Sequence, residues 1–161
     1  VKLILPGGGA FGECMKRLRA LSLDEAIKSA VRRGTPLLGI CLGLQLLFER
    51  SEEFGTHEGL GLLPGGVTKL KAGNRPLPHI AWTSIENVRG RLLGGIESGE
   101  YFYFVHSYCV HAACPGDEAA TADYGETFTA AAERDNVFGV QFHPEKSGSR
   151  GLAILKNYIG I

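Results

Sequence analysis

The stretch Gly39-Ile40-Cys41-Leu42-Gly43 decides how the chain is interpreted. The apolar run at 36–40 predicts a buried strand, and the proline-free run from Leu44 predicts a helix that continues to about Arg50. Cys41 therefore stands at a strand-to-helix turn, with a glycine two residues away on each side. This is the pattern of a G-x-S-x-G nucleophile elbow in which sulfur replaces oxygen.

The surroundings of Cys41 favour a reactive thiol. Glycines on both flanks are expected to leave the approach to the sulfur open, and the positive end of the following helix is expected to lower the thiol pKa. Gln45 lies about one helical turn further on, so it can face the same pocket. A buried structural cysteine between small residues is the alternative, so the assignment depends on partners elsewhere in the chain.

A possible partner lies near the C-terminal end, in Val-Gln-Phe-His-Pro-Glu-Lys-Ser at 140–147. A strand is expected to end at His143, which Pro144 holds in an extended conformation. Residues two apart in an extended chain point the same way, so Glu145 can accept a hydrogen bond from one imidazole nitrogen. The other nitrogen is then free to take a proton from Cys41. A lone histidine before a proline is often structural, but this grouping with a cysteine elbow predicts a nucleophile, a base and an orienting carboxylate.

Composition limits the class of protein. The chain has 161 residues, is 44% hydrophobic and 21% charged, and has a formal net charge of zero, which suits one compact domain over 1–161. Zero net charge without a long basic run argues against nucleic-acid binding. No apolar run approaches the roughly 18–20 residues of a membrane span, and no signal peptide is expected. The four cysteines show no disulfide-framework spacing, so we expect a cytoplasmic protein without a membrane partner.

The first sixty residues predict alternating strands and helices. A short strand at 2–5 leads into Pro6-Gly7-Gly8-Gly9, which is either a ligand-binding loop of free backbone N–H groups or an ordinary glycine turn. Ser22 with Glu25 predicts a capping box that opens a helix ending near Gly34. Strand–helix–strand–helix order indicates a parallel sheet, and ligands gather at the carboxyl ends of its strands.

From about Gly61 the pattern changes to short β-branched or aromatic runs, which predict antiparallel strands at 66–70, 78–85, 101–108, 121–124, 128–134 and 137–142. Asp135-Asn136 predicts a hairpin turn. A last helix is expected from about Ser149, with Leu152, Leu155 and Ile159 on its apolar side. The expected fold is a three-layer α/β/α domain with a mostly parallel mixed central sheet and a small antiparallel sheet.

Four potential metal ligands lie close together in the sequence, namely His106, Cys109, His111 and Cys114. Thiolates and imidazoles favour zinc. In an extended strand, however, His106 and Cys109 face opposite sides, and no C-x₂-C pair is present. We therefore expect ordinary strand and loop residues, with no metal and no other cofactor. Glu53 is likewise expected to be part of a charged helix end.

The motifs together resemble a known family. G-I-C-L-G-x-Q at 39–45 and V-Q-F-H-P-E-K-S at 140–147 resemble the triad class, or class I, of glutamine amidotransferases. P-G-G-G-A-F-G at 6–12, C-L-G-L-Q-L-L-F-E at 41–49, L-P-H-I-A-W at 77–82 and Y-F-V-H-S-Y at 103–108 are similar to the glutaminase subunit of imidazole glycerol phosphate synthase, from histidine biosynthesis. The likeness runs from about Ile4 to Tyr158 and implies a flavodoxin-like fold.

The resemblance implies a catalytic role for three residues. Cys41 would attack the side-chain amide carbon of glutamine and form a thioester, which water would hydrolyse to glutamate. His143 would take the thiol proton and hand it to departing ammonia, and Glu145 would orient His143.

The resemblance also assigns residues to the oxyanion hole and to substrate binding. The Leu42 N–H would form the oxyanion hole with an N–H of the Gly8-Gly9 segment. The groups that would hold glutamine are Gln45 and the backbone around Ser107 and Tyr108.

A partner is implied as well. Ammonia would pass into a (β/α)₈-barrel cyclase, bound as a heterodimer, which makes imidazole glycerol phosphate and an aminoimidazole carboxamide ribotide. Trp82, Tyr103 and Lys146 match positions at or near that interface. The family also has a strand and a helix before the position of Val1, and we expect this unit to be absent or to lie outside this sequence. Ala81 and Thr83 replace the usual glycine and asparagine beside Trp82, and Gly8 stands where a bulkier residue is common.

Three other functions remain compatible with the sequence. A glutaminase of another pathway, such as pyridoxal phosphate or purine synthesis, would keep the triad and change the partner. A cysteine peptidase or other thiol hydrolase would use the same cysteine and histidine on another substrate. An inactive, truncated interaction subunit would need neither.

Overall fold

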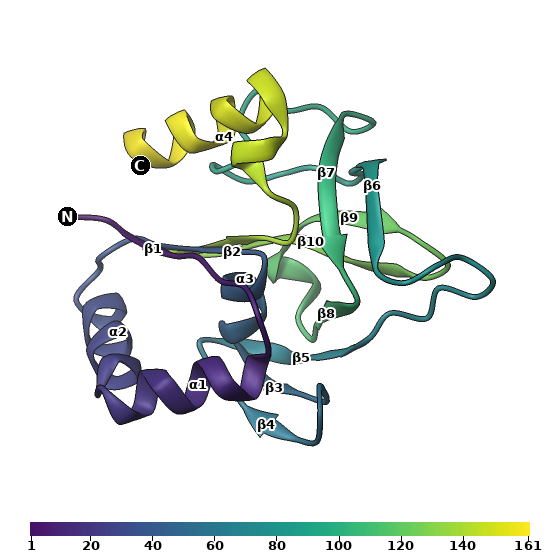
Figure 1. The fold of residues 1–161 in the computed structure, drawn as a ribbon. Coiled ribbons are helices and arrows are strands. Elements are labelled where there is room, and N and C mark those ends of the chain that lie inside the picture. The colour runs from purple at the N-terminus through teal and green to yellow at the C-terminus, as the bar shows by residue number, and fades with distance from the viewer.

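The structure is a computed structural model that describes residues 1–161, and it has three layers (Figure 1). The main sheet has the strand order β1 (Leu3–Leu5), β2 (Leu37–Ile40), β11 (Val137–Val140), β10 (Thr127–Arg134), β8 (Tyr108–Ala112), β5 (Leu63–Lys69), β3 (Phe48–Ser51) and β4 (His57–Glu58). Strand β9 (Glu118–Asp123) pairs with β10 off this path, and β6 (His79–Ser84) pairs with β7 (Tyr101–His106) in a separate sheet.

Helices cover both faces of the first part of this sheet (Figure 1). Helices α1 (Phe11–Ala20) and α2 (Leu23–Arg32) lie on one side, and α4 (Gly148–Gly160) lies on the other. The short helix α3 (Leu42–Leu46) follows β2, and the single turns η1 (Pro115–Asp117) and η2 (Pro144–Lys146) precede β9 and α4. None of the helices combines the length and the apolar character that crossing a membrane would need.

Strand directions make this a mixed sheet. Strands β1, β2 and β11 are parallel, as are β3 and β5, and the remaining pairings are antiparallel. The two-stranded β6–β7 sheet is antiparallel. The predicted α/β/α class, with a mixed central sheet and a small antiparallel one, is therefore confirmed. The predicted hairpin at Asp135-Asn136 is confirmed too, since it joins antiparallel β10 and β11, and Asp135 has φ 53°.

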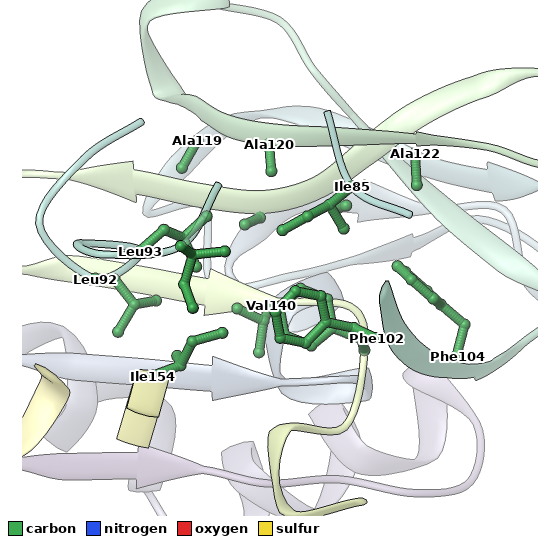
Figure 2. Packing of buried hydrophobic residues seen from close by; sticks show 14 of the residues in the cluster. Ile85, Leu92, Leu93, Phe102, Phe104, Ala119, Ala120, Ala122, Val140 and Ile154 are labelled. Carbon is green, nitrogen blue, oxygen red and sulfur yellow. The ribbon is translucent and has the colours of Figure 1, made fainter. Parts of the chain in front are cut away.

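Alternation along the central strands builds one core on each side of the sheet. In β2, Leu37 packs with α1, whereas Leu38 faces the opposite core that contains Ile154 and Tyr158 of α4. Figure 2 shows this second core, in which Ile154 lies near Val140 and the ring of Phe102 from the small sheet. The small sheet is thus fixed to the main sheet by apolar packing.

One expectation about helix extent was wrong, and one helix was not predicted. The helix after Cys41 ends at Leu46 rather than near Arg50, and residues Phe48–Ser51 form strand β3. The run from Leu42 to Phe48 is buried on every side, so its periodicity does not distinguish a helix from a buried strand. Helix α1 at Phe11–Ala20 was not delimited from the sequence, because the only helix start predicted in that region was at Ser22.

Two expectations about helix detail were also wrong. Ser22 precedes α2 but has φ 57° and no side-chain capping bond, so the capping box does not form. In α4, Leu152 is 54% exposed and Ile159 is 71% exposed, while Ile154 and Tyr158 are buried. The buried face of α4 is therefore not the one expected. Gly151 lies on the buried face, against the Pro144 carbonyl, where a Cβ atom would lie 1.9 Å from the oxygen.

Candidate active site

Cys41 occupies a strained turn between β2 and α3. It has φ 57° and ψ −110°, a conformation that side-chain-bearing residues rarely adopt. The turn is held because the Cys41 N–H donates to the Val140 carbonyl of β11 at 2.8 Å. The nucleophile elbow predicted from the sequence has this backbone shape.

The two glycines that flank Cys41 allow backbone segments to pack closely around the turn. A Cβ atom on Gly43 would lie 1.8 Å from the Leu5 carbonyl oxygen, and one on Gly39 would lie 2.5 Å from the Gly43 carbonyl oxygen. These contacts are with backbone, which cannot rotate away. The glycines thus let β1, β2 and α3 come together, whereas the sequence had suggested that they keep the approach to sulfur open.

A cavity of about 260 Å³ opens beside the elbow. Cys41 and His143 both line it, although 102 positions separate them in the sequence. Gly8, Gly9 and Leu42 line it as well. So do Gln45, Ser107 and Tyr108. The residues assigned from the sequence to the nucleophile, base, oxyanion hole and substrate contacts therefore meet at one cavity, with Glu145 behind His143.

The Cys41 thiol is half-buried and lies among weak polar partners. Its sulfur donates to the Val105 carbonyl at 3.8 Å and accepts from Gln141 Nε2 at 3.7 Å. It makes no hydrogen bond to His143 in this structure. Gln141 was not singled out from the sequence, although it stands two residues before His143.

The pKa of Cys41 is raised, contrary to the expectation of a lowered value. Burial is the largest cause, and the Glu145 carboxylate adds to it. The Leu42 N–H, the Gln141 amide and the Lys146 ammonium act in the opposite direction without overcoming burial. The resting thiol is therefore protonated at neutral pH, which makes a nearby base necessary.

His143 is fixed by its neighbours. Its Nδ1 lies 2.7 Å from Glu145 Oε1, and its backbone N–H donates to the Tyr103 carbonyl of β7 at 3.0 Å. The Ser147 hydroxyl donates to the His143 carbonyl at 2.6 Å and accepts from the Tyr103 N–H at 3.0 Å. Because Nδ1 bonds Glu145, Nε2 is the ring nitrogen that is free to bond a group in the cavity. The predicted His143–Glu145 contact is thus present.

Gln45 is buried beneath the cavity. Its amide nitrogen donates to the Tyr108 carbonyl at 3.1 Å and to Gln141 Oε1 at 3.2 Å. Both amide protons are thereby used, which leaves the Gln45 carbonyl oxygen as the group that can accept from a ligand.

A buried histidine pair lies behind the same wall and was missed in the sequence. His106 Nδ1 is 2.9 Å from the Tyr108 carbonyl, His106 Nε2 is 2.9 Å from His79 Nδ1, and His79 Nε2 is 2.7 Å from Thr83 Oγ1. The carbonyl only accepts, so protons sit on both Nδ1 atoms and the Thr83 hydroxyl donates to His79. Burial lowers the pKa of both His79 and His106 to about 4. The available signal was that both histidines lie in aromatic runs that pair in register.

Other predicted positions lie around this site. Trp82 pairs with Tyr103 across the small sheet, with ring centroids 6.0 Å apart, and is 52% exposed. Lys146 is exposed in η2. Glu53 was wrongly assigned to a charged helix end, since it lines the cavity and accepts a hydrogen bond from the Phe11 N–H at 2.9 Å.

Comparison with known proteins identifies relatives over nearly the whole chain. A family model described as "Glutamine amidotransferase class-I" matches residues 2–160. The imidazole glycerol phosphate synthase subunit HisH of Syntrophotalea carbinolica is 51% identical over 98% of this chain and 80% of its own length. The HisH subunit of Aquifex aeolicus is 48% identical over 97% of this chain and 75% of its own length.

Solved structures show the same fold at lower identity. The structure of PurLQS from Thermotoga maritima matches with a TM-score of 0.72 and 22% identity, covering 99% of this chain and 79% of the other. A putative GMP synthase protein from Thermoplasma acidophilum matches with a TM-score of 0.70 and 24% identity, covering 99% and 71%. At these identities the likeness concerns the fold alone.

Proposed function

Because the chain belongs to the class-I glutamine amidotransferase family, we propose that it releases ammonia from glutamine at Cys41 for a cyclase subunit of histidine biosynthesis. The observation that carries the proposal is one cavity lined by Cys41 and Leu42 of the strained elbow and by His143 beyond the end of β11. The pathway is inferred from the HisH relatives, which are 51% and 48% identical to this chain.

In the first half of the reaction, the Cys41 sulfur attacks the side-chain amide carbon of glutamine while His143 Nε2 takes the thiol proton. Because burial raises the pKa of Cys41, proton transfer accompanies attack rather than preceding it. Glu145 stabilises the imidazolium that forms, through the contact at 2.7 Å. The amide oxygen becomes an oxyanion that the Leu42 N–H and the Gly8-Gly9 backbone would stabilise.

In the second half, His143 gives its proton to the departing nitrogen, and ammonia leaves with a Cys41 thioester remaining. Water then attacks the thioester carbon with His143 as base, which releases glutamate and restores the thiol. The thiol in the resting structure contacts the Val105 carbonyl, so it must turn toward His143 when glutamine binds. Such a loose resting geometry suits an enzyme that is weakly active alone.

The end of glutamine that carries the α-amino and α-carboxyl groups fits the wall opposite the elbow. The free carbonyl oxygen of Gln45 can accept from the α-ammonium, and the backbone at Ser107 and Tyr108 supplies further polar groups. These contacts bind glutamine without taking part in bond breaking. Loss of one of them is expected to raise KM more than it lowers kcat.

The proposed partner is the (β/α)₈-barrel cyclase, docked on the small sheet and η2. Ile80 and Trp82 alternate outward along β6 and are 56% and 52% exposed. Tyr103 lies beside Trp82, and Lys146 follows Glu145 next to the catalytic histidine. An exposed apolar surface this close to the cavity is what ammonia transfer to a second subunit needs.

The test measures glutamate release by the purified chain, with and without a ligand-bound cyclase of a close HisH relative's complex. Slow release alone, stimulation by the cyclase and loss in Cys41→Ala are expected. Trp82→Ala should weaken the stimulation and leave the basal rate unchanged.

Each rival function has its own outcome in this assay. Turnover that is equal with and without the cyclase would favour a glutaminase of another pathway, and cleavage of peptides or esters in place of glutamine would favour a thiol hydrolase. Absence of glutamate under every condition would favour an inactive interaction subunit.

A further inference from the structure

Away from the active site, three side chains with metal-ligand chemistry converge on one face of β8. Cys109 and His111 are two residues apart on this strand, so they face the same way, and Glu126 reaches them from the turn between β9 and β10. Cys109 Sγ lies 3.5 Å from His111 Nε2 and 3.9 Å from Glu126 Oε2, and His111 Nε2 lies 3.1 Å from Glu126 Oε1. One ligand atom from each residue lies within 4.8 Å of the other two.

We propose that Cys109, His111 and Glu126 form a site for a divalent transition metal of the zinc class. A tetrahedral ion with bonds of about 2.0 Å to nitrogen or oxygen and about 2.3 Å to sulfur holds its ligand atoms roughly 3.3–3.6 Å apart. The separations of 3.5 Å between Cys109 Sγ and His111 Nε2 and of 3.1 Å between His111 Nε2 and Glu126 Oε1 lie around that range, and all three ligand atoms fall within 4.8 Å of one another. A thiolate, an imidazole and a carboxylate are also the ligand types that zinc prefers.

The carboxylate is held in place by a contact from outside the cluster. The backbone N–H of Lys71 donates to Glu126 Oε2 at 2.6 Å, which orients the carboxylate with Oε1 at His111. Such outer contacts to a ligating carboxylate are a regular part of metal sites. Cys109 is fully buried, whereas the His111 side chain is 41% exposed. Solvent therefore reaches the cluster from one side and can provide a fourth ligand.

An ion pair between His111 and Glu126 accounts for only part of this arrangement. A pair at the protein surface contributes about 0–1 kcal/mol and does not require a cysteine. The cluster differs from the four potential ligands noted in the sequence. His106 does not belong to it, because it bonds His79 and the Tyr108 carbonyl. Cys114 does not belong to it either, since it precedes η1. A metal here would tie β8 to the β9–β10 turn one residue beyond Tyr108.

Cobalt(II) is the probe, because a thiolate ligand gives it an intense sulfur-to-metal charge-transfer absorption. The titration uses the metal-free Cys41→Ser protein, which removes the active-site thiol as a competing ligand. One equivalent of cobalt should produce the absorption. Cys109→Ala should abolish it, and His111→Asn and Glu126→Gln should each weaken binding at least tenfold. Cys114→Ser is the matched control and should leave it unchanged.

A second readout guards against a variant that folds poorly. Zinc should raise the midpoint temperature of unfolding of the Cys41→Ser protein. It should not do so when His111→Asn is added to that protein, and the half-exposed position of His111 tolerates this change. Absence of the cobalt absorption in the Cys41→Ser protein, or its persistence in Cys109→Ala, would overturn the proposal. An absorption seen only when Cys41 is present would assign the metal to the active site and would also overturn it.

Discussion

His79 Nδ1 lies 2.9 Å from His106 Nε2, and both imidazoles are buried and neutral. The Tyr108 carbonyl sets the direction of this hydrogen-bond chain, because it accepts from His106 and from Gln45 at once. The cavity wall formed by Gln45 and Tyr108 is thereby connected to Thr83 on the small sheet, which carries Trp82 on its outer side.

This pair predicts an acid-sensitive contribution to stability. Burial lowers the pKa of both histidines to about 4, whereas an unfolded histidine titrates near 6.5. The contribution is therefore complete above about pH 6.5 and is lost as the pH falls toward 4, at about 1.4 kcal/mol per pH unit for one histidine. Urea unfolding between pH 5 and 8 should show this loss.

His79→Phe is the comparison for this prediction. Phenylalanine keeps the stacking on Phe104 and Tyr124 and removes one titrating group. The variant should be less stable at pH 8, because His106 Nε2 loses its donor, and its stability should fall less steeply toward pH 5. Parallel curves for the two proteins would contradict the neutral pair.

The ionisation of Cys41 should respond in opposite directions to two substitutions. Gln141→Leu removes a donor to sulfur and should raise the pKa further, whereas Glu145→Gln removes a negative charge and should lower it. The measurement is the rate of alkylation by iodoacetamide against pH. The inflection in the unchanged protein should lie above the roughly 8.5 of a free cysteine. Cys14 and Cys114 are free and partly exposed, so both are replaced by serine in every protein compared, whereas Cys109 is buried and its pKa is raised to about 12. Shifts of the same sign in both variants would rule out these two contacts as the causes.

Gly43 and Gly8 should tolerate alanine very differently. A Cβ on Gly43 would collide with the Leu5 carbonyl, and overpacking costs about 1–3 kcal/mol, with the upper end expected where backbone cannot move away. A Cβ on Gly8 meets nothing within 4 Å, so Gly8→Ala should change the free energy of unfolding by about 0.5 kcal/mol or less. Chemical denaturation of both variants checks the difference, and equal stabilities would show that the elbow is looser than described.

Ser147 should act as a positioning residue for His143. Ser147→Ala leaves the Tyr103 N–H and the His143 carbonyl each without one partner, at a cost of about 1–3 kcal/mol. We expect kcat for glutamine hydrolysis to fall while the pH profile of Cys41 alkylation stays the same. Ser149→Ala is the matched control, because Ser149 is exposed in the first turn of α4, two residues after Ser147. An unchanged kcat in Ser147→Ala would remove the proposed role.

The sequence was sufficient for the parts of the site that local geometry determines. Glycines on both sides of Cys41 permit a tight turn, and a proline after His143 restricts the backbone, so the elbow and the His143–Glu145 contact could be predicted. The raised pKa of Cys41 could not be, because it depends on burial by distant segments. The same holds for the His79–His106 pair, which forms only when β6 and β7 are in register.

Predictions of fold details were wrong where a short apolar run fits both a helix and a strand. Residues 44–48 satisfy a buried helix and a buried strand equally well, and pairing of β3 with β5 decides between them. The apolar stripe of α4 was misplaced by one helical face because Gly151 has no side chain to mark its buried position. A hydrophobic pattern alone therefore does not indicate that such a glycine is buried.

The ladder between β2 and β11 pairs Gly39 with Gly139 and Ile40 with Val140, one residue before Cys41 and three residues before His143. A slip of one residue would move the imidazole about 3.3 Å along the strand and turn it to the other face of the sheet. Leu44 opposes such a slip, because it lies where any Cβ at position 139 would be 2.4 Å from its Cδ1 atom. A larger residue at 139 should therefore weaken this preference for one register, and a fall in glutamate release would report the misalignment of His143 with Cys41 even in a variant that still folds.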